Sequence, residues 1–447
     1  MGKLAYLFPA FPVFHQTFVL WEVLGLRRIG LNPRMYSLKP GTERQQPEAA
    51  ELANEVTYLP ALGSAEVRAA NWRLLRRHPL TYLGLFVSVF RAWQTGEIVS
   101  EPPSQTGARP LPLRDRLRGW YNRQPYLYLL KSWVLVPQGV ELAERLQRDG
   151  ITHLHVHWAT YPTTVAYVVK LISGIPFSFS AHAYDIYMIS RMLPAKIGAA
   201  RFVATCARAN AAFLSQLARP QDRDRIHVIY HGVDVHRFLP VPRSESQGRP
   251  LKVVSCGQLE RYKGFHQLID ACGRLKKEGI AVDCRIVGEG PWRGYLEEQI
   301  ATLDLGGSVV LMGALPHTEL AAMLAEADVF ALASEIGGKS GRRDVIANVL
   351  VEAMAAGLPV IASRIPGAEE LIVDGDCGFL IEPNRIDQLA EALKRLAVDP
   401  ALRERLGAAA RERVLRDFDN SKNIRTMAIM LQEATDDGAR QRVAAVG

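Results

Sequence analysis

The sequence predicts an α/β protein built from two doubly wound domains, each with a parallel sheet between layers of helices. The chain has 447 residues, which is about three times the length of a typical single domain. Short apolar, β-branched runs alternate with longer stretches of helical spacing, which is the pattern of βαβ units. A stretch rich in proline and polar residues, 240–250, lacks this pattern, and we interpret it as the linker between the domains.

The alternation is most regular after the linker. The predicted strands of this half are residues 251–255, 281–287, 308–312, 328–333, 359–362 and 378–381. Stretches with helical spacing, such as 267–277, separate these strands, so we expect helices on both faces of a parallel sheet. We predict a C-terminal domain over 251–418 and a final segment, 419–447, that packs back toward the first domain.

The first half repeats the alternation less regularly. Its predicted strands are residues 3–8, 33–37, 153–157, 176–180, 201–204 and 227–229. We predict an N-terminal domain over 1–239 with a helical insertion at about 65–138, where the alternation breaks.

The insertion carries much of the chain's positive charge. Residues 65–135 contain eleven basic and four acidic residues, interleaved with tryptophan, tyrosine and phenylalanine. This composition is typical of helices that lie on an anionic lipid interface, so we predict membrane contact through 65–135. The ordinary alternative is a set of helices that pack one face on the domain and leave their arginines in water.

The composition excludes several classes of protein. The formal charge of +8 suits an anionic substrate or surface, but no DNA- or RNA-binding motif accompanies it, and we expect no nucleic-acid partner. Five widely spaced cysteines without a C-x-x-C pair argue against a disulfide scaffold or a zinc site and favour a reducing cytoplasm. Pro9 interrupts the first apolar run, so we predict no signal peptide, and no uncharged apolar run is long enough to predict a transmembrane helix.

The strongest chemical motif lies at 344–362. Asp344 precedes a predicted helix, 347–356, that ends at Gly357. The free amides of the first helical residues and the helix dipole favour an anion, and Glu352 further along can accept hydrogen bonds from hydroxyls such as those of a ribose. We therefore expect this site to bind phosphate and sugar groups together. The amides that we assign to the ligand belong to Asn348, Val349 and Leu350.

Two glycine-containing loops follow predicted strands. In 255–265, a strand leads through Gly257 into a loop that carries Arg261 and Lys263, an arrangement that presents amides and cations to a diphosphate. The third motif is the turn with Gly288 and Gly290, where glycine permits close approach of a ligand at the carboxyl end of a strand. In the first half, His182 stands just past a predicted strand, where an active-site side chain would project.

Together these motifs resemble those of the GT-B glycosyltransferases of family 4 (group 1), and in particular enzymes of the exopolysaccharide and colanic-acid type. Asp344 and Glu352 match the D/E-x7-E motif, with Val345 in place of the usual small residue. The segment 257–264 is similar to G-R-L-x-x-x-K-G, with Gln258 at the usual arginine position. The turn after residue 286 matches V-G-x-G-P, and 177–186 matches F-S-x-x-A-H-A-x-D-I around His182.

The resemblance implies a GT-B fold, in which two Rossmann-like domains face each other across a cleft and the C-terminal domain holds the donor. It implies a retaining, metal-independent hexosyltransferase that uses a nucleotide-diphosphate sugar, most commonly a UDP-sugar. The acceptor would be a lipid-linked molecule or a saccharide in the synthesis of cell-surface polysaccharide or glycolipid. We accordingly expect no cofactor and a cytoplasmic protein at the inner face of the cell membrane.

The resemblance also implies roles for single residues. Asp344 and His182 would be catalytic, orienting the donor sugar, while Lys263, with Arg261, would stabilise the departing diphosphate and Glu352 would hold the nucleoside ribose. Thr17 and His157 are the candidates on the acceptor side.

One alternative of a different class stays open: a GT-B protein that has lost transfer activity and binds membranes or polyanions. The departures from the family pattern at Gln258 and Val345 are the reason to keep it.

Overall fold

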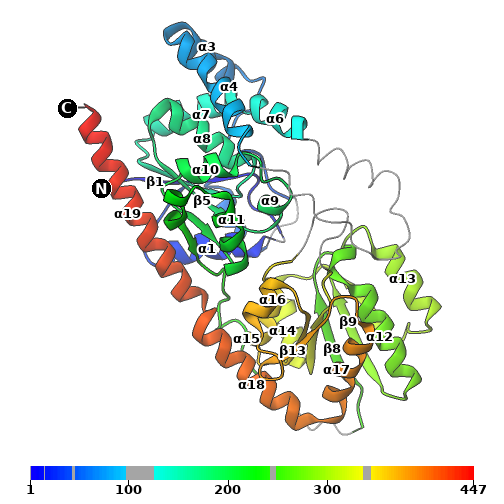
Figure 1. Ribbon diagram of the computed structural model, residues 1–447. Coiled ribbons are helices and arrows are strands. Elements are labelled where there is room, and N and C mark those ends of the chain that lie inside the picture. The colour runs from blue at the N-terminus through cyan, green and yellow to red at the C-terminus, as the bar shows by residue number, and fades with distance from the viewer. Residues whose placement is uncertain are drawn as a thin grey trace. The chain divides into compact units, whose positions relative to one another are not determined.

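The computed structural model describes residues 2–14, 16–42, 46–96, 125–241, 248–335 and 344–446. The chain divides into two compact units (Figure 1). The first comprises Met1–Ile229 and Ile424–Gly447, and the second comprises Tyr230–Asn423. Each unit has its own parallel sheet, as the sequence predicts.

The described residues of the first unit form a seven-stranded parallel sheet in the order β3-β2-β1-β4-β5-β6-β7. The strands are β1 (Leu4–Phe8), β2 (Arg34–Ser37), β3 (Thr57–Tyr58), β4 (His153–His157), β5 (Phe177–Ala181), β6 (Val203–Thr205) and β7 (Ile226–Val228). All but β3 coincide with predicted strands to within a few residues. A two-residue strand is too short to leave a hydrophobic pattern, which is why the sequence does not reveal it.

Helices cover both faces of this sheet. They are α1 (Thr17–Arg28), α2 (Ala49–Ala53), α3 (Ala65–Arg77), α4 (Pro79–Trp93), α6 (Pro125–Val134), α7 (Val136–Arg148), α8 (Tyr161–Ser173), α9 (Tyr184–Tyr187), α10 (Leu193–Ala199) and α11 (Arg208–Leu217), with the 3₁₀ helix η1 (Pro220–Arg225). Along β1, Ala5 and Leu7 belong to one core cluster and Leu4, Tyr6 and Phe8 to another, because alternate side chains point to opposite faces. The strand is therefore apolar throughout, as expected of a sheet buried on both sides.

The described part of the predicted insertion is mostly helical. Helix α3 packs on α4 and α7, and α4 packs on α6 and α8 (Figure 1). The remainder of the predicted membrane region, 97–124, lies outside the described residues.

The second unit holds a six-stranded parallel sheet in the order β10-β9-β8-β11-β12-β13 within its described part. Its strands are β8 (Leu251–Cys256), β9 (Val282–Val287), β10 (Val309–Gly313), β11 (Val329–Leu332), β12 (Val360–Ser363) and β13 (Gly378–Ile381). Its helices are η2 (Arg261–Lys263), α12 (Phe265–Lys277), α13 (Arg293–Thr302), α14 (His317–Glu326), α15 (Asn348–Ala355), α16 (Pro366–Leu371), α17 (Ile386–Val398) and α18 (Pro400–Asp417). Every strand overlaps a predicted one.

The boundary between the units differs from the predicted one. The second unit begins at Tyr230, before the predicted linker, because Val233 and Phe238 pack into its core with Phe418. The amide of Val233 also donates to the Phe418 carbonyl at 2.9 Å. Sequence periodicity does not detect this short segment, which joins the second core without belonging to a strand or helix.

The last helix, α19 (Asn420–Val446), contributes to the first unit from Ile424 onward. Its residues Ile424, Met427, Leu431 and Ala434 share a core cluster with β1. Their spacing of three and four residues places them along one face of the helix.

All five cysteines are free thiols. Among the described residues, no helix has both the length and the apolar character needed to cross a bilayer.

Candidate functional site

The carboxyl ends of β8 and β11 mark the point where the strand order of the second sheet reverses. Strand β8 pairs with β9 on one side and with β11 on the other. Open α/β sheets bind ligands in the crevice at such a switch point. The loop after β8 leads through η2 into α12, and the chain after β11 leads to α15. The fold thus brings the predicted donor-binding segments to one edge of one sheet.

Lys263 and Asp344 meet at this edge. Lys263 Nζ donates to Asp344 Oδ1 at 2.6 Å, and both side chains are largely buried. Ser334, just after β11, donates its hydroxyl to the other carboxylate oxygen, also at 2.6 Å. Burial lowers the pKa of Lys263, but the Asp344 carboxylate, Tyr262 and Cys256 together raise it more, so the pKa lies above its usual value. The site therefore holds a firmly protonated lysine.

Glu352 lies inside the same region with one oxygen unsatisfied. Its Oε1 is 3.0 Å from Nε2 of His317, whereas its buried Oε2 has no hydrogen-bond partner among the described residues. Burial and the charge of Glu352 raise the pKa of the neighbouring Cys256 thiol to about 12, an effect that Lys263 opposes. An unsatisfied buried carboxylate oxygen is costly unless a ligand donates to it. Glu352 is thus ready to accept a hydrogen bond from a hydroxyl.

The predicted phosphate-binding helix, α15, begins at Asn348. No side chain caps its first turn, so its leading N–H groups are available to an anion. Asn348 and Val349 are partly exposed there. Leu350 is buried in the core and its amide donates to the Ala347 carbonyl at 2.9 Å, so it contributes less than predicted.

The predicted glycines prove to hold two loops against each other. A Cβ at Gly288 would overlap the Gly257 carbonyl oxygen, and one at Gly290 would overlap the backbone of Leu259. The Leu259 amide donates to the Glu289 carbonyl at 3.0 Å. The close approach that these glycines permit is therefore to the neighbouring loop, which positions η2 and its lysine.

Glu335, which follows β11, was not predicted as a site residue. Its carboxylate lies 3.3 Å from Nε of Arg261 and 3.2 Å from Nε2 of His266. Arg261 is thus fixed by an acid rather than left in solvent. No sequence motif indicates this contact, since it joins loops after two different strands.

In the first unit, His182 follows β5 and its main chain is fixed by Asp185. The Asp185 carboxylate accepts from the amides of His182 (3.0 Å) and Ala159 (2.7 Å). The acceptor-side candidate Thr17 begins α1, next to Phe18, whose ring centroid is 4.8 Å from that of His182.

His157, the other acceptor-side candidate, is completely buried between two polar partners. Its Nε2 is 3.2 Å from Glu22 Oε1 and its Nδ1 is 3.4 Å from Nε2 of His182. It can influence a ligand only through His182. Glu22, on α1, was not predicted, because nothing in the sequence relates it to a strand 135 residues away.

Glu22, His155 and His157 could in principle hold a metal ion, since their ligand atoms lie within 4.8 Å of one another. Contacts within the protein already account for His155, whose two ring nitrogens lie 2.8 Å and 3.0 Å from the hydroxyls of Ser178 and Ser180. That the reaction needs no metal stays a prediction.

Comparison with known proteins agrees with this geometry. Residues 241–413 match the family described as Glycosyl transferases group 1. The chain contains a glycosyl transferases group 1 domain. This domain spans β8 to β13 and includes the Lys263–Asp344 pair and Glu352.

Curated proteins of polysaccharide biosynthesis resemble part of the chain. The chain is 37% identical over 211 residues to the putative colanic acid biosynthesis glycosyltransferase WcaL of Salmonella typhimurium, covering 47% of this chain and 51% of that protein. It is 32% identical over 209 residues to the amylovoran biosynthesis glycosyltransferase AmsK of Erwinia amylovora, covering 47% and 51%. The chain thus spans about half the length of the curated relatives it matches.

Solved structures resemble the whole chain. Sucrose-phosphate synthase from Thermosynechococcus elongatus matches with a TM-score of 0.66 at 18% identity, over 99% of this chain and 100% of that one. Anabaena HepE in complex with UDP matches with a TM-score of 0.66 at 18% identity, over 96% and 100%. These relatives are GT-B glycosyltransferases, so the predicted GT-B fold is confirmed.

Proposed function

We propose that the protein transfers a sugar from a nucleotide-diphosphate sugar, with UDP-sugars as the first donors to test, to a lipid-linked or saccharide acceptor. The product would belong to cell-surface polysaccharide or glycolipid synthesis. The observation that carries the donor half is the buried Glu352 carboxylate, whose Oε2 lacks a partner, in the same sheet-edge region as the protonated Lys263. A nucleoside diphosphate offers what this arrangement needs: hydroxyls to donate and phosphates to accept.

The roles follow from the chemistry of each group. Lys263, supported by Arg261 and the start of α15, binds the diphosphate. Glu352 accepts from a ribose hydroxyl. Asp344, held by Ser334 and Lys263, lies beside the diphosphate-binding cation and is the group that we assign to the donor sugar.

We further propose retention of configuration without a metal ion. The bond between the anomeric carbon and the phosphate oxygen breaks, and the acceptor hydroxyl oxygen forms its bond to the same face of the sugar. The acceptor proton passes to the departing phosphate oxygen, so no protein nucleophile is needed. Lys263 stabilises the negative charge that grows on the leaving diphosphate. His182 is the proposed sugar contact from the first unit.

The acceptor half of the proposal places the protein at the inner face of the cell membrane. The named activities of WcaL and AmsK, colanic acid and amylovoran biosynthesis, support a polysaccharide acceptor. The helices of the 65–135 region support peripheral contact with anionic lipid.

A thermal-shift screen against UDP, GDP, ADP and their sugar conjugates tests the donor site, because a ligand that binds only the folded state raises the melting temperature. We expect one nucleotide class to raise it in the wild type and not in Glu352→Ala. Purified protein that binds no nucleotide and hydrolyses no nucleotide sugar would instead favour the non-catalytic alternative.

A further inference from the structure

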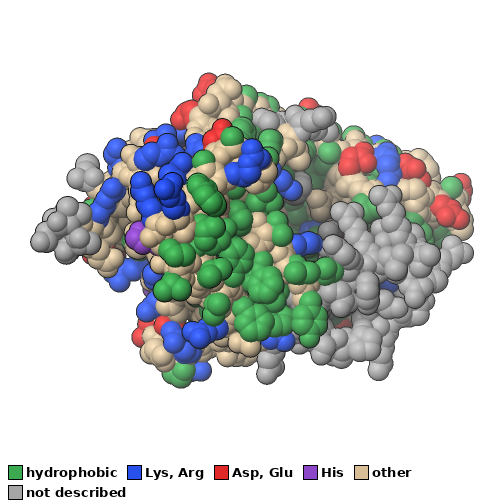
Figure 2. Space-filling view, turned by 90° about the horizontal axis from the view of Figure 1, so that it is seen from above, with side chains coloured by type: hydrophobic (Ala, Val, Ile, Leu, Met, Phe, Trp, Pro, Cys, Tyr) green, Lys and Arg blue, Asp and Glu red, His purple; other side chains and the backbone are tan. Residues whose placement is uncertain are grey.

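One face of the first unit exposes a continuous set of large apolar side chains, which we call the apolar face. Figure 2 shows hydrophobic side chains gathered there, with Lys and Arg around them. The stripe on α4 follows helical spacing, with Leu80 85%, Leu83 58% and Val87 49% exposed. The remaining members are Phe90 of α4 and Tyr126, Leu130 and Val134 of α6.

Packing among the described residues of the unit does not explain why these side chains are apolar. The opposite side of α4, including Leu85 and Val89, is buried in a core cluster with Tyr128 and Leu129 of α6. Among the described residues, helix α4 therefore has large apolar side chains on its exposed side as well as on its buried side. A surface helix of a soluble domain normally turns polar residues outward, and an exposed apolar patch marks a surface that something else covers.

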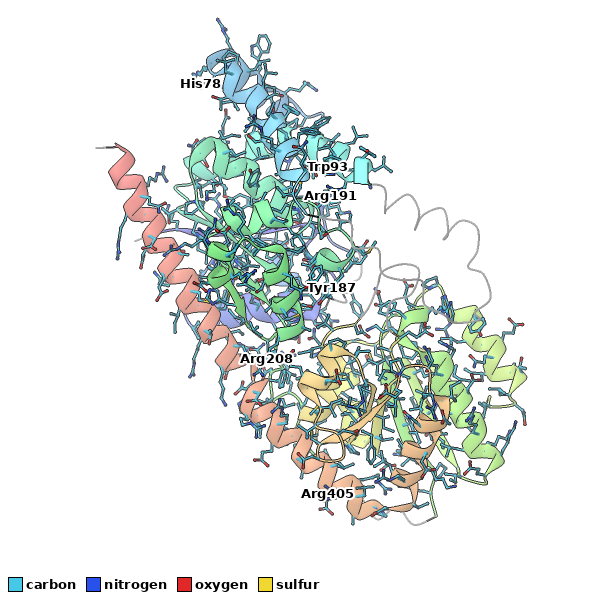
Figure 3. All side chains as sticks on the ribbon, viewed as in Figure 1. His78, Trp93, Tyr187, Arg191, Arg208 and Arg405 are labelled. Carbon is cyan, nitrogen blue, oxygen red and sulfur yellow. The ribbon has the colours of Figure 1, made fainter. Side chains whose placement is uncertain are left out.

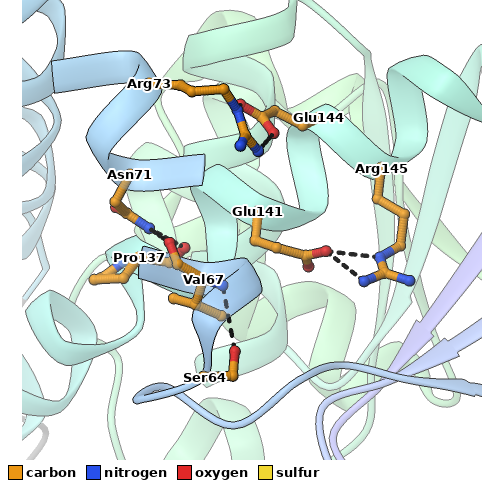
Figure 4. A network of polar contacts seen from close by, with 8 residues as sticks. All are labelled: Ser64, Val67, Asn71, Arg73, Pro137, Glu141, Glu144 and Arg145. Carbon is orange, nitrogen blue, oxygen red and sulfur yellow. Dashed lines mark hydrogen bonds and ion pairs between the residues drawn. The ribbon is translucent and has the colours of Figure 1, made fainter. Parts of the chain in front are cut away.

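Helix α3, which leads into α4 and the apolar face, is attached to the unit by polar contacts. Ser64 caps α3 by accepting from the Val67 amide at 3.2 Å, and Asn71 donates to the Pro137 carbonyl at 3.0 Å (Figure 4). Arg73 makes a two-point contact with Glu144 of α7, at 3.2 and 2.5 Å.

The end of α4 is held in a similar way. The guanidinium of Arg191 lies 5.0 Å from the Trp93 ring centroid (Figure 3), and the Trp133 indole N–H of α6 donates to the Phe86 carbonyl at 3.1 Å. The exposed side chains are thus carried by helices that also contact the rest of the first unit.

The charged residues on the two helices of the apolar face have one sign. Helices α4 and α6 contain no acidic residue, whereas Arg76 and Arg77 lie at the end of α3 next to Leu80, and Arg91 lies next to Phe90. All three arginines are exposed. An apolar surface bordered by arginine complements a bilayer whose headgroups are anionic.

We propose that the apolar face docks on an anionic membrane, with the α4 and α6 side chains entering the interface and the arginines contacting phosphate headgroups. Helix α4 has 15 residues, about 22 Å at 1.5 Å per residue, so it lies in the interface and does not span the bilayer. The docking is argued from exposed side chains and charge alone. Only its use, access to a lipid-linked acceptor, rests on the proposed function.

Flotation of the full-length protein with lipid vesicles tests the docking. We expect binding to vesicles that contain phosphatidylglycerol, and at least about tenfold weaker binding to phosphatidylcholine alone or at high salt. Leu83→Glu should abolish binding, and Arg76→Gln with Arg77→Gln should remove the preference for anionic lipid. Ile429→Glu on α19 is the matched control, because Ile429 is 60% exposed but lies on another helix.

Equal binding to neutral and anionic vesicles, or unchanged binding by Leu83→Glu, would overturn the proposal. So would sedimentation showing that the apolar face instead joins two copies of the chain, with a dimer that Leu83→Glu dissociates and no vesicle binding. The nucleotide thermal shift is measured on the same variants. If no nucleotide raises the melting temperature of the wild type or of any variant, but the wild type still binds vesicles, the proposed function is contradicted and the docking proposal is not.

A separate hydrogen-bonded chain supports a second inference about His182. Glu22 Oε1 accepts from the Tyr6 hydroxyl at 2.8 Å and lies 3.2 Å from Nε2 of His157. Nδ1 of His157 lies 3.4 Å from Nε2 of His182, and the two imidazole planes are parallel to within 2°. These hydrogen-bonded residues lie on β1, at the carboxyl ends of β4 and β5, and on α1, which follows β1. The strand order of the first sheet reverses between β1 and β4, so this is its switch point.

We infer that Glu22 is a positioning residue that sets the tautomer of His182 through His157. Since a carboxylate only accepts, His157 donates from Nε2, and its neutral ring then accepts at Nδ1 from Nε2–H of His182. His182 then carries its proton on Nε2, and its Nδ1 is an acceptor. The use of that form rests on the role of His182 in the proposed function, but the tautomer itself does not.

Long-range ¹⁵N–¹H NMR of histidine-labelled protein reads the tautomer without any donor. We expect a single Nε2–H form of His182 in the wild type and a mixture in His157→Phe, where a similar ring keeps the packing but removes both contacts. Glu55→Gln, on an exposed acid paired with Arg27, is the control and should change nothing. A mixture of His182 tautomers in the wild type, or no change in His157→Phe, would overturn the inference. If the expected tautomers are found but the protein has no transfer activity, only the proposed function is contradicted.

Discussion

Nζ of Lys263 lies 2.6 Å from Oδ1 of Asp344, and this contact joins two predicted site residues that are 81 positions apart. The pair is largely buried, so each charge depends on the other for stabilisation. A diphosphate that binds Lys263 has to share the ammonium group with the Asp344 carboxylate or displace that carboxylate. In the proposed function, the Asp344 carboxylate and the diphosphate therefore compete for one cation, so a change at Asp344 should affect binding and turnover differently.

Asp344→Asn should bind UDP about two- to tenfold more tightly than the wild type while losing most transfer activity. The amide keeps a hydrogen-bonding group near Ser334 but releases Lys263 to the phosphates, whereas the sugar loses its carboxylate. Isothermal titration with UDP and a turnover assay measure the two effects. Asp304→Asn, at an exposed pair with Lys276, is the control. Weaker UDP binding together with normal turnover would exclude the assigned role.

Lys263→Ala and Glu352→Ala should respond differently to UDP and to inorganic pyrophosphate. Lys263→Ala should weaken both ligands, because both present phosphates. Glu352→Ala should weaken UDP about ten- to hundredfold, the worth of a hydrogen bond to a charged group, and leave pyrophosphate unaffected. Competition of each ligand against a fluorescent nucleotide measures this, and equal losses for both ligands in Glu352→Ala would contradict a ribose contact.

The sequence predicts the sheets well because parallel strands covered on both faces are continuous apolar runs, as in β1 and β8. It also indicates Lys263, Asp344 and Glu352, which lie in recognisable segments after strands. It does not indicate His317 or Glu22, because their contacts depend on how helices pack across 35 and 135 residues of chain. For the same reason, the sequence identified Gly288 and Gly290 but not the neighbouring loop against which they pack.

Gly288→Ala should destabilise the second unit by about 2 kcal/mol or more and weaken nucleotide binding through the displaced η2 loop. Gly288 has φ +143°, and its added methyl would overlap the Gly257 carbonyl oxygen. Gly294→Ala is the matched control, since that glycine lies in α13 with no atom within 4 Å of the added methyl. It should be neutral or stabilising by about 0.5–1 kcal/mol. Urea unfolding measures the stability of both variants and of the wild type. If Gly288→Ala is as stable as Gly294→Ala, Gly288 has no packing role.

Stability should fall in acid through Glu22 in a predictable range of pH. Burial raises the pKa of Glu22, but His157, His155 and the hydrogen bond from Tyr6 together lower it more, to about 2, below the value in the unfolded chain. A depressed carboxyl pKa stabilises the fold above the unfolded value, about 4.3, and this stability is lost as the pH falls toward 2. The shift corresponds to about 3 kcal/mol.

Urea unfolding from pH 7 to pH 2 should therefore show a larger loss of stability for wild type than for Glu22→Gln, which has no proton to take up. The neighbouring groups are the Tyr6 hydroxyl and the rings of His155 and His157. Burial lowers the pKa of His155 well below its usual value, so His155 makes both proteins less stable in acid. The difference between the two curves reports the ionisation of Glu22 together with its coupling to His157 and His155. If the stabilities of the two proteins fall in parallel below pH 4, the Glu22–His157 contact contributes nothing to stability. That result would also contradict the inference that Glu22 fixes His182 through His157.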